Sequence, residues 1–364
     1  MIIKTLKCGI LEAPLITPFK TALRTVEKIR DVIVILETDT GAIGYGEAPP
    51  TKAITGETEE TLLSDLMGPI RKAVVGKDLN DLDRLFAALD TCMEHHTSAK
   101  AAVDIAVYDL LGQAEKKPVY QLFGGTRSSI ETDLTISVND PSVMASDARA
   151  AIARGFRTLK IKVGINPSLD VERLIAVRQA VGKDIIIRAD ANQAWNAQQA
   201  VDLLQEIQSH AINLELIEQP VKAADLEGLA YVTAHSPVPV VADESCFSPE
   251  DARKIYQEHL ADMVNIKLMK CGGLHNALKI VQYAKEAGAQ CMLGCMLEAK
   301  VSVNAAVQLA CAEDCITKID LDGPALCSED PVIGGSVFAG PVIHACKEPG
   351  FGIQELKGLK IIDF

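Results

Sequence analysis

The chain has 364 residues, of which 48% are hydrophobic and 23% charged, so it is long enough to bury a large core. Its net charge of −13 and its lack of basic runs argue against nucleic acid or an anionic membrane as a partner. The N-terminus has no signal-peptide pattern, and no segment approaches the roughly 18 uninterrupted apolar residues of a membrane span. We therefore expect a soluble, cytoplasmic protein.

Residues 1–125 predict a separate α+β domain, because strand patterns are followed by a run of helical patterns. The expected strands cover residues 2–8, 32–38 and 42–47, and the expected helices cover residues 57–75, 79–92 and 98–116. Ser98 is the expected N-cap of the last helix. The polar segment 14–30 is interpreted as a long functional loop, and Gly44-Tyr-Gly46 as a hairpin turn.

Strand and helix patterns alternate over residues 126–340, which predicts a (β/α)7β TIM-like barrel. The expected strands begin near residues 130, 157, 184, 213, 238, 262, 290 and 316, with helices that include 141–154, 197–209 and 273–287. A doubly wound sheet would also alternate, but no glycine-rich phosphate loop follows a first strand. Residues 341–364 have short strand character and are expected to return to the first domain.

Five of the predicted barrel strands end in a charged residue. These residues are Lys162, Asp190, Glu218, Asp243 and Lys267. Their spacings of 28, 28, 25 and 24 residues each fit one strand, one helix and two short loops. Because the carboxyl ends of barrel strands meet at one mouth, we expect these five side chains to be neighbours. Lys160 lies two residues before Lys162 and therefore faces the same side of its strand.

Three clustered carboxylates repel one another unless a cation balances them, and oxygen ligands on rigid strands suit Mg²⁺. Any one of the three acids alone could be an ordinary charged strand end. Lysines on opposite sides of the ring predict that Lys162 and Lys267 exchange a proton at one carbon from opposite faces, while Mg²⁺ stabilises an enediolate. Lys160 and the metal would lower the pKa of Lys162.

These residues resemble the motifs of the enolase superfamily, and in particular its muconate-lactonising subgroup. The matching motifs are Lys160-x-Lys162, Asp190-x-Asn192, Glu218-Gln-Pro, Asp243-Glu-Ser and Lys267. The resemblance extends over essentially the whole chain and implies that the first domain caps the barrel. It does not select the reaction, because the same constellation serves racemisation, cycloisomerisation and dehydration.

Further features are similar to those of dipeptide epimerases. The resemblance implies that Asp320 and Asp322 hold the ammonium group of a dipeptide, and that Arg24 in the predicted loop binds a glutamyl side chain. It also implies that Thr135, Cys295 and Leu297 line the dipeptide site. The implied activity is Mg²⁺-dependent epimerisation of L-Ala-D/L-Glu in the turnover of murein peptides.

Several alternatives stay open at this point. Asp320 and Asp322 could be capping residues, and Arg24 could be a solvated loop charge. A muconate-type cycloisomerase or an o-succinylbenzoate synthase would use the same lysines, and a binding barrel without catalysis is a third reading. The bulk of Cys295 and Leu297 leaves the first residue of the dipeptide open. The sequence is also compatible with a homo-oligomer.

Overall fold

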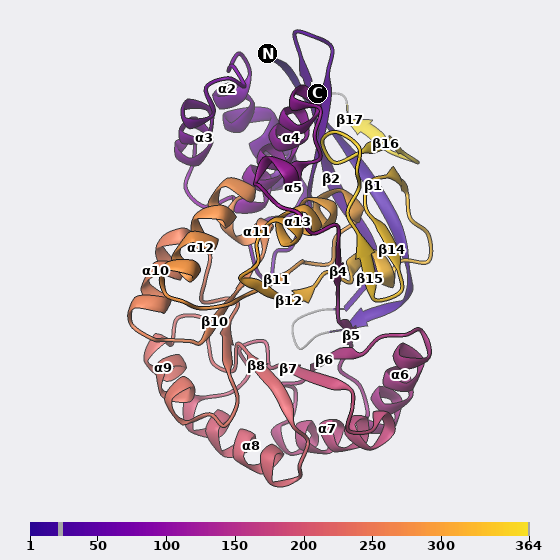
Figure 1. The fold of residues 1–364 in the computed structure, drawn as a ribbon, viewed down its shortest axis with the longest axis vertical. Helices are drawn as coiled ribbons and strands as arrows, with labels where there is room; N and C mark the ends of the chain where they lie inside the picture. Colours follow the sequence, from indigo (N-terminus) through magenta and orange to yellow (C-terminus); the bar gives the residue numbers. More distant parts are fainter. Residues whose placement is uncertain (21–24, 363–364) are drawn as a thin grey trace.

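The computed structural model describes residues 1–20 and 25–362, and Figure 1 shows an N-terminal part above a barrel. The N-terminal part is built on an antiparallel sheet with the strand order β17-β1-β2-β3. Its strands are β1 (Ile3–Lys20), β2 (Thr25–Thr38), β3 (Ile43–Ala48) and β17 (Lys360–Ile362). The pairing of β17 with β1 places the last described strand of the chain on the sheet formed by its first residues.

The predicted loop over residues 14–30 is wrong, because most of this segment belongs to a long hairpin. Strands β1 and β2 pair with a register that runs from Ile3↔Thr38 to Lys20↔Thr25. Among the described residues, Thr17, Thr25, Lys28 and Arg30 are exposed on this hairpin, and Lys28 and Arg30 both donate to Glu12 across the strands.

Helices pack against this sheet, and two of the predictions for them need correction. The elements are α1 (Glu59–Asp65), the π-helical turn η1 (Leu66–Ile70), α2 (Arg71–Val74), α3 (Leu82–Thr91), α4 (Thr97–Glu115) and α5 (Val119–Leu122). The single helix expected over residues 57–75 is broken at Gly68-Pro69, since proline lacks the N–H that would continue the helix. Ser98 is not the N-cap of α4. It lies inside this helix, where its amide and that of Ala99 donate to Glu57, both at 3.0 Å.

The glycines of Gly44-Tyr-Gly46 lie inside strand β3, so the interpretation as a turn is also wrong. A Cβ atom at Gly46 would lie 1.7 Å from the carbonyl oxygen of Ala102, and one at Gly44 would lie 2.3 Å from that of Ala106. Both carbonyls belong to α4. The two glycines therefore let the backbone of this buried helix rest directly on the sheet.

The barrel prediction is confirmed. Eight parallel strands follow one another in chain order from β5 to β12. They are β5 (Leu134–Ile136), β6 (Thr158–Lys162), β7 (Ile186–Asp190), β8 (Leu214–Glu218), β9 (Val240–Ala242), β10 (Met263–Ile266), β11 (Cys291–Gly294) and β12 (Ile316–Asp320). The helices between them are α6 (Pro141–Ala153), α7 (Pro167–Val181), α8 (Ala197–Ser209), α9 (Leu226–His235), α10 (Pro249–Gln257), α11 (Leu268–Cys271), α12 (Leu274–Glu286) and α13 (Lys300–Ala312).

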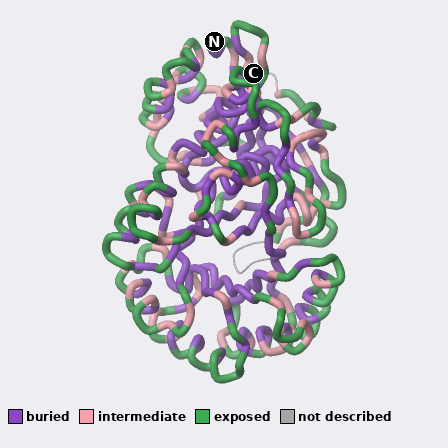
Figure 2. Tube along the Cα trace, viewed as in Figure 1, coloured by how far each residue is buried: buried purple, intermediate pink, exposed green. Residues whose placement is uncertain are grey.

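Strand β12 is followed by the short 3-10 turn η2 (Gly323–Leu326) in place of an eighth helix, as the predicted (β/α)7β order implies. Two small sheets complete the fold. Strand β13 (Val332–Gly334) pairs with β16 (Ile353–Leu356), and β15 (Val342–His344) pairs with both β14 (Val337–Ala339) and β4 (Ser129–Glu131). Buried residues concentrate along the barrel strands and where the N-terminal helices meet the barrel, while the outer helices turn an exposed side outward (Figure 2). Within residues 1–20 and 25–362, no helix has the length and apolar character needed to cross a membrane.

A buried histidine joins the N-terminal helices to the barrel. His275, in the first turn of α12, contacts Asp104 of α4 through Nδ1 at 2.6 Å and Asp90 of α3 through Nε2 at 3.0 Å. Its ring stacks on that of Phe86 with the centroids 4.4 Å apart. Burial opposes the charged imidazolium, but hydrogen bonds to the two carboxylates outweigh it and raise the pKa of His275 to about 9.

Candidate active site

The three acids at the barrel strand ends come together as predicted. Asp190 and Glu218 end β7 and β8, Asp243 directly follows β9, and all three side chains are buried. Carboxylate oxygens of the three residues lie within 4.8 Å of one another. Burial, followed by the Asp190 charge, raises the pKa of Glu218 to about 7, although the charge of Lys160 lowers it.

The three predicted lysines surround these acids. Lys162 Nζ lies 2.6 Å from Asp190, and Lys267 Nζ lies 2.6 Å from Asp243. Lys160 Nζ lies deeper, 2.7 Å from Glu218. Lys162 ends β6 and Lys267 directly follows β10, four strands further round a ring of eight, so the two lysines reach the centre from opposite sides.

The acid cluster has the donor set of a divalent-cation site. Glu218 Oε2 and Asp243 Oδ1 are buried and accept no well-directed hydrogen bond from the described residues, although Lys160 and Lys270 nitrogens lie 2.7 and 2.6 Å away. Carboxylate oxygens that converge from three rigid strands fit the hard, oxygen-preferring Mg²⁺ ion. The geometry of the chain therefore agrees with the predicted cofactor.

Two buried residues that hold the acids in place were not predicted. Asn265 Nδ2 donates to Glu218 at 2.9 Å, and Lys270 Nζ pairs with Asp243 at 2.6 Å. Asn265 could have been found, because it lies two residues before Lys267 and thus shares its face of the chain. Lys270 lies in the short helix α11, where no periodic pattern marks it.

A cavity opens above the acids. Its lining includes the predicted residues Lys160, Lys162, Lys267, Thr135, Cys295, Leu297, Asp320 and Asp322. The predicted metal ligand Asp243 lines it as well. Eight further lining residues were not assigned to the site from the sequence, although the motifs contained Asn192 and Glu244. They are Phe19, Thr51, Ala53, Ile54, Asn192, Glu244, Met296 and Leu326. Four of them come from the N-terminal part, so the first 54 residues help to enclose the barrel mouth. Arg24 lies outside the described residues.

Asp320 and Asp322 form an acidic wall of this cavity. Asp320 ends β12 and accepts from Lys160 Nζ at 2.7 Å. Burial would raise the pKa of Asp320, but the Lys160 charge overcomes it and lowers the pKa to about 2. Asp322 accepts from the backbone amide of Thr135 at 2.6 Å, while burial and the Asp320 charge raise its pKa to about 6. Two same-facing carboxylates at a cavity wall can bind a cationic group.

A barrel with three acids at consecutive strand ends and two opposed lysines defines a class of enzymes, and comparison with known families identifies it. Residues 143–356 match the family model described as enolase C-terminal domain-like. Residues 7–124 match the N-terminal domain of mandelate racemase / muconate lactonizing enzyme. The chain therefore belongs to the enolase superfamily, in its mandelate racemase and muconate lactonizing enzyme family, and the predicted resemblance is confirmed.

Several individual proteins are similar to this chain over nearly its full length. The chain is 50% identical to the L-Ala-D/L-Glu epimerase of Clostridium acetobutylicum over 97% of this chain and 99% of that protein. A substrate-liganded complex of the L-Ala-D/L-Glu epimerase from Bacillus subtilis has a TM-score of 0.96 at 40% identity, covering 97% of this chain and 99% of that one. The Enterococcus faecalis dipeptide epimerase with Mg and L-Leu-L-Tyr has a TM-score of 0.93 at 41% identity, covering 97% and 100%.

Proposed function

We propose that the protein is a Mg²⁺-dependent isomerase that epimerises dipeptides at their C-terminal residue, with L-Ala-L-Glu and L-Ala-D-Glu as its substrates. The observation that carries the proposal is the pair of opposed lysines beside the buried acids, in a cavity whose wall carries Asp320 and Asp322. The relatives named L-Ala-D/L-Glu epimerase support the choice of dipeptide.

The chain supplies two proton carriers and a fixed frame for the substrate. Lys162 and Lys267 each remove or return the α-proton on one face of the substrate carbon, so that inversion needs both. Asp190, Glu218 and Asp243 would hold Mg²⁺, which when bound stabilises negative charge on the substrate carboxylate. Lys160 adds a fixed positive charge next to these acids, and apolar side chains such as Ile54 and Leu297 keep water from the reacting carbon.

The two ends of the dipeptide meet different walls of the cavity. Asp320 and Asp322 bind the free ammonium group, and Thr135, Cys295 and Leu297 line the site of the first residue. Arg24 is expected to pair with the glutamyl side-chain carboxylate, as its match to the family motif implies. This set of contacts favours a substrate that is cationic at one end and acidic at the other.

A cycloisomerase or an o-succinylbenzoate synthase would use the same lysines, but its substrate has no ammonium group for Asp320 and Asp322 to bind. A binding barrel without catalysis would have no use for two proton carriers. The dipeptide proposal thus uses both the lysine pair and the Asp320/Asp322 pair, whereas each alternative leaves one of these pairs unexplained.

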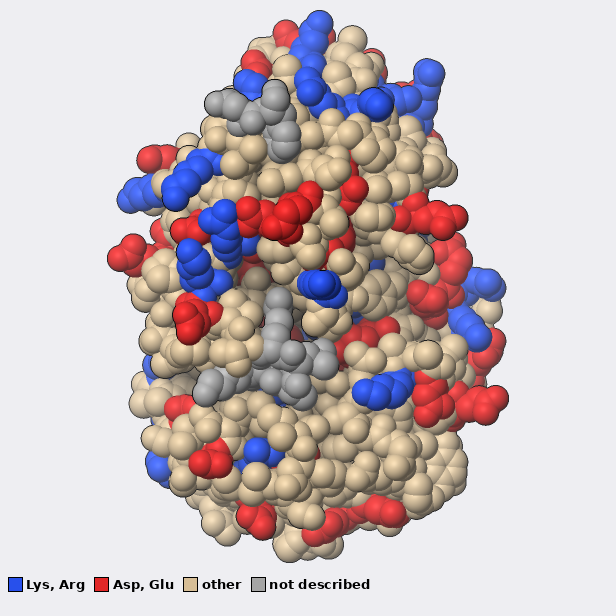
Figure 3. All heavy atoms as spheres, turned by 180° about the vertical axis from the view of Figure 1, so that it is seen from behind, with Lys and Arg blue, Asp and Glu red and all other residues tan. Residues whose placement is uncertain are grey.

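The remaining partners follow from charge and composition. On the face shown in Figure 3, described acidic and basic side chains are interspersed, and the net charge is −13. We therefore expect neither nucleic acid nor a membrane as a partner, and a cytoplasmic location with murein peptides as the source of substrate. A homo-oligomer is compatible with this role.

A library of L,L-dipeptides incubated in D₂O with Mg²⁺ and read by mass shift tests the substrate assignment. We expect Xaa-Glu dipeptides to gain deuterium fastest, with Ala first, and Arg24→Ala to relax the preference for Glu. The double variant Asp320→Asn/Asp322→Asn should abolish labelling. Full labelling by this double variant, or preferential labelling of Xaa-Lys by the wild type, would refute the assignment.

A further inference from the structure

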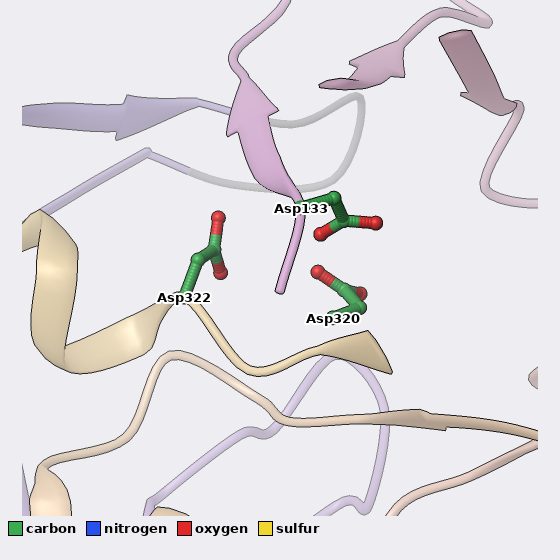
Figure 4. Close-up of side chains that lie close together, drawn as sticks. All are labelled: Asp133, Asp320 and Asp322. Atoms are coloured by element: carbon green, nitrogen blue, oxygen red, sulfur yellow. The ribbon is translucent and has the colours of Figure 1, made fainter. Parts of the chain in front are cut away.

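A third buried carboxylate lies against the acidic wall of the cavity. Asp133 immediately precedes strand β5, is 1% exposed, and has carboxylate oxygens within 4.8 Å of those of Asp320 and Asp322. Figure 4 shows the carboxyl groups of Asp133 and Asp320 pointing toward one another. Asp133 belongs to none of the sequence motifs and takes no part in the proposed proton transfer.

One side of the Asp133 carboxyl group is firmly anchored and the other is not. Arg188 Nη1 donates to Asp133 Oδ2 at 2.7 Å and to the carbonyl of Ile319 at 3.0 Å, while its Nε donates to Glu215 at 2.7 Å. Asp133 Oδ1 is buried and has no hydrogen-bond partner within the described chain. A fixed carboxyl group whose free oxygen lies in an acidic cluster is suited to act on a cation there.

The cluster has one more carboxylate than it has cations. Lys160 pairs with Asp320, and Arg188 pairs with Asp133. Asp322 accepts a hydrogen bond from the uncharged backbone amide of Thr135. Lys160 also serves Asp190 and Glu218, so it cannot compensate the cluster further. Burial, followed by the charge of Asp320, raises the pKa of Asp133, and a cationic group bound beside the cluster would favour the ionised form of Asp133.

The cluster also sits at the closing seam of the barrel, where β5 meets β12. The described sheet runs from β5 round to β12, and single contacts join these two edges. The amide of Asp133 donates to Ile319 at 3.2 Å, and that of Leu321 donates to Thr132 Oγ1 at 2.8 Å. The place of Asp320 relative to β5 therefore depends on the residues around Asp133.

We propose that Asp133 is a positioning residue for the amino terminus of the substrate: held by Arg188 behind Asp320, it supplies the surplus negative charge that a substrate ammonium group balances. The inference rests on the proposed function and deepens it. Asp133 does not line the cavity, so it acts through Asp320 rather than by touching the ligand. The ligand class it selects is a dipeptide with a free, cationic amino terminus.

The test compares Asp133→Asn with wild type, using L-Ala-L-Glu and N-acetyl-L-Ala-L-Glu, which lacks the ammonium charge. Calorimetric Kd values with Mg²⁺ present, together with KM and kcat for α-proton exchange, are measured for each. We expect KM and Kd for L-Ala-L-Glu to rise about tenfold, kcat to change little, and binding of the N-acetyl analogue to stay unchanged. Asn keeps the shape and can still accept from Arg188, so the charge is the main difference.

Thr132→Val is the matched control, because it removes the seam hydrogen bond from Leu321 without changing any charge. We expect it to lower the melting temperature while leaving the preference for the free amino terminus intact. An unchanged preference in Asp133→Asn, or an equal loss of preference in Thr132→Val, would overturn the proposal. Wild-type protein that binds L-Ala-L-Glu without exchanging its α-proton would refute the proposed function alone, since the Kd comparison still decides the role of Asp133. Wild-type protein that binds neither peptide would overturn both.

Discussion

Removing the charge of His275 should weaken the connection between the N-terminal helices and the barrel in a pH-dependent way. The pKa of His275 is raised from 6.5 to about 9 by Asp104 and Asp90, against the opposing effect of burial. At about 1.4 kcal/mol per pH unit, this rise corresponds to roughly 3 kcal/mol of stability. Because the folded pKa lies above the unfolded value, this stability is complete below about pH 6.5 and is lost as the pH rises through 9.

The assay is urea unfolding of the wild type and of His275→Gln at a series of pH values from 6 to 10. Buried thiols such as Cys8 and Cys246 also make the protein less stable at high pH, because burial raises their pKa to about 12 in the folded state. The difference between the two proteins removes this shared contribution. We expect His275→Gln to be less stable at pH 6 by up to roughly 3 kcal/mol and the gap to close by pH 10.

His235→Gln is the matched control, because His235 is exposed and bonds only the carbonyl of Tyr231 among the described residues. Its unfolding curve should follow that of the wild type at every pH. A gap between wild type and His275→Gln that stays constant from pH 6 to 10 would contradict the ion-pair explanation and leave only loss of packing against Phe86.

Three further predictions concern the site and its support. Lys162→Met and Lys267→Met should each abolish epimerisation, yet each variant should still exchange the α-proton of one of the two epimers. NMR in D₂O can follow this exchange. Exchange of the α-protons of both epimers by either variant would contradict the two-face mechanism. Gly46→Ala should cost at least about 3 kcal/mol or prevent folding, because the new Cβ would clash with Ala102, whereas Gly68→Ala meets no atom within 4 Å and serves as its control. Chelation with EDTA should abolish exchange and added Mg²⁺ should restore it; activity that survives complete chelation would rule out the metal role of Asp190, Glu218 and Asp243.

The barrel and its charged strand ends could be predicted because each barrel unit repeats the same local pattern. An apolar strand followed by an amphipathic helix is visible in a window of about 25 residues, and the barrel topology then places Lys162 and Lys267 without further information. The hairpin of β1 and β2 was missed for the opposite reason. The residues at the open end of the hairpin pair with partners far away in the sequence, such as Ile3 with Thr38. The polar residues of the hairpin have a composition that is also typical of loops.

Ser98 was wrongly predicted as an N-cap because the capping group of α4 comes from a distant part of the chain, as it does for two other helices. Glu57 accepts from the first turn of α4, Asp104 accepts from the amides of Leu274 and His275 in α12, and Glu47 accepts from Ala299 and Ser302 at α13. Such carboxylates favour a helix N-terminus as a local cap does. A rule that searches for the cap in the adjacent sequence cannot find them.

Asp133 shows the same limit at the site itself. One aspartate before a short strand carries no signal in sequence, and its importance arises only when β5 and β12 meet at the seam. Asp320 and Asp322 were proposed because their Asp-x-Asp motif resembles that of the dipeptide epimerases, and two carboxylates at one strand end can form a cation site. Clusters assembled from separate strands need the closed barrel before they can be recognised.

The most direct test of the central claim is the isotopic content of the first product formed from L-Ala-L-Glu in D₂O with Mg²⁺. With Lys162 and Lys267 on opposite faces, we predict that early L-Ala-D-Glu carries deuterium at the α-carbon while the unreacted substrate still holds hydrogen there. Early product that keeps the original α-hydrogen, or a failure to convert L-Ala-L-Glu to L-Ala-D-Glu, would contradict the two-lysine mechanism.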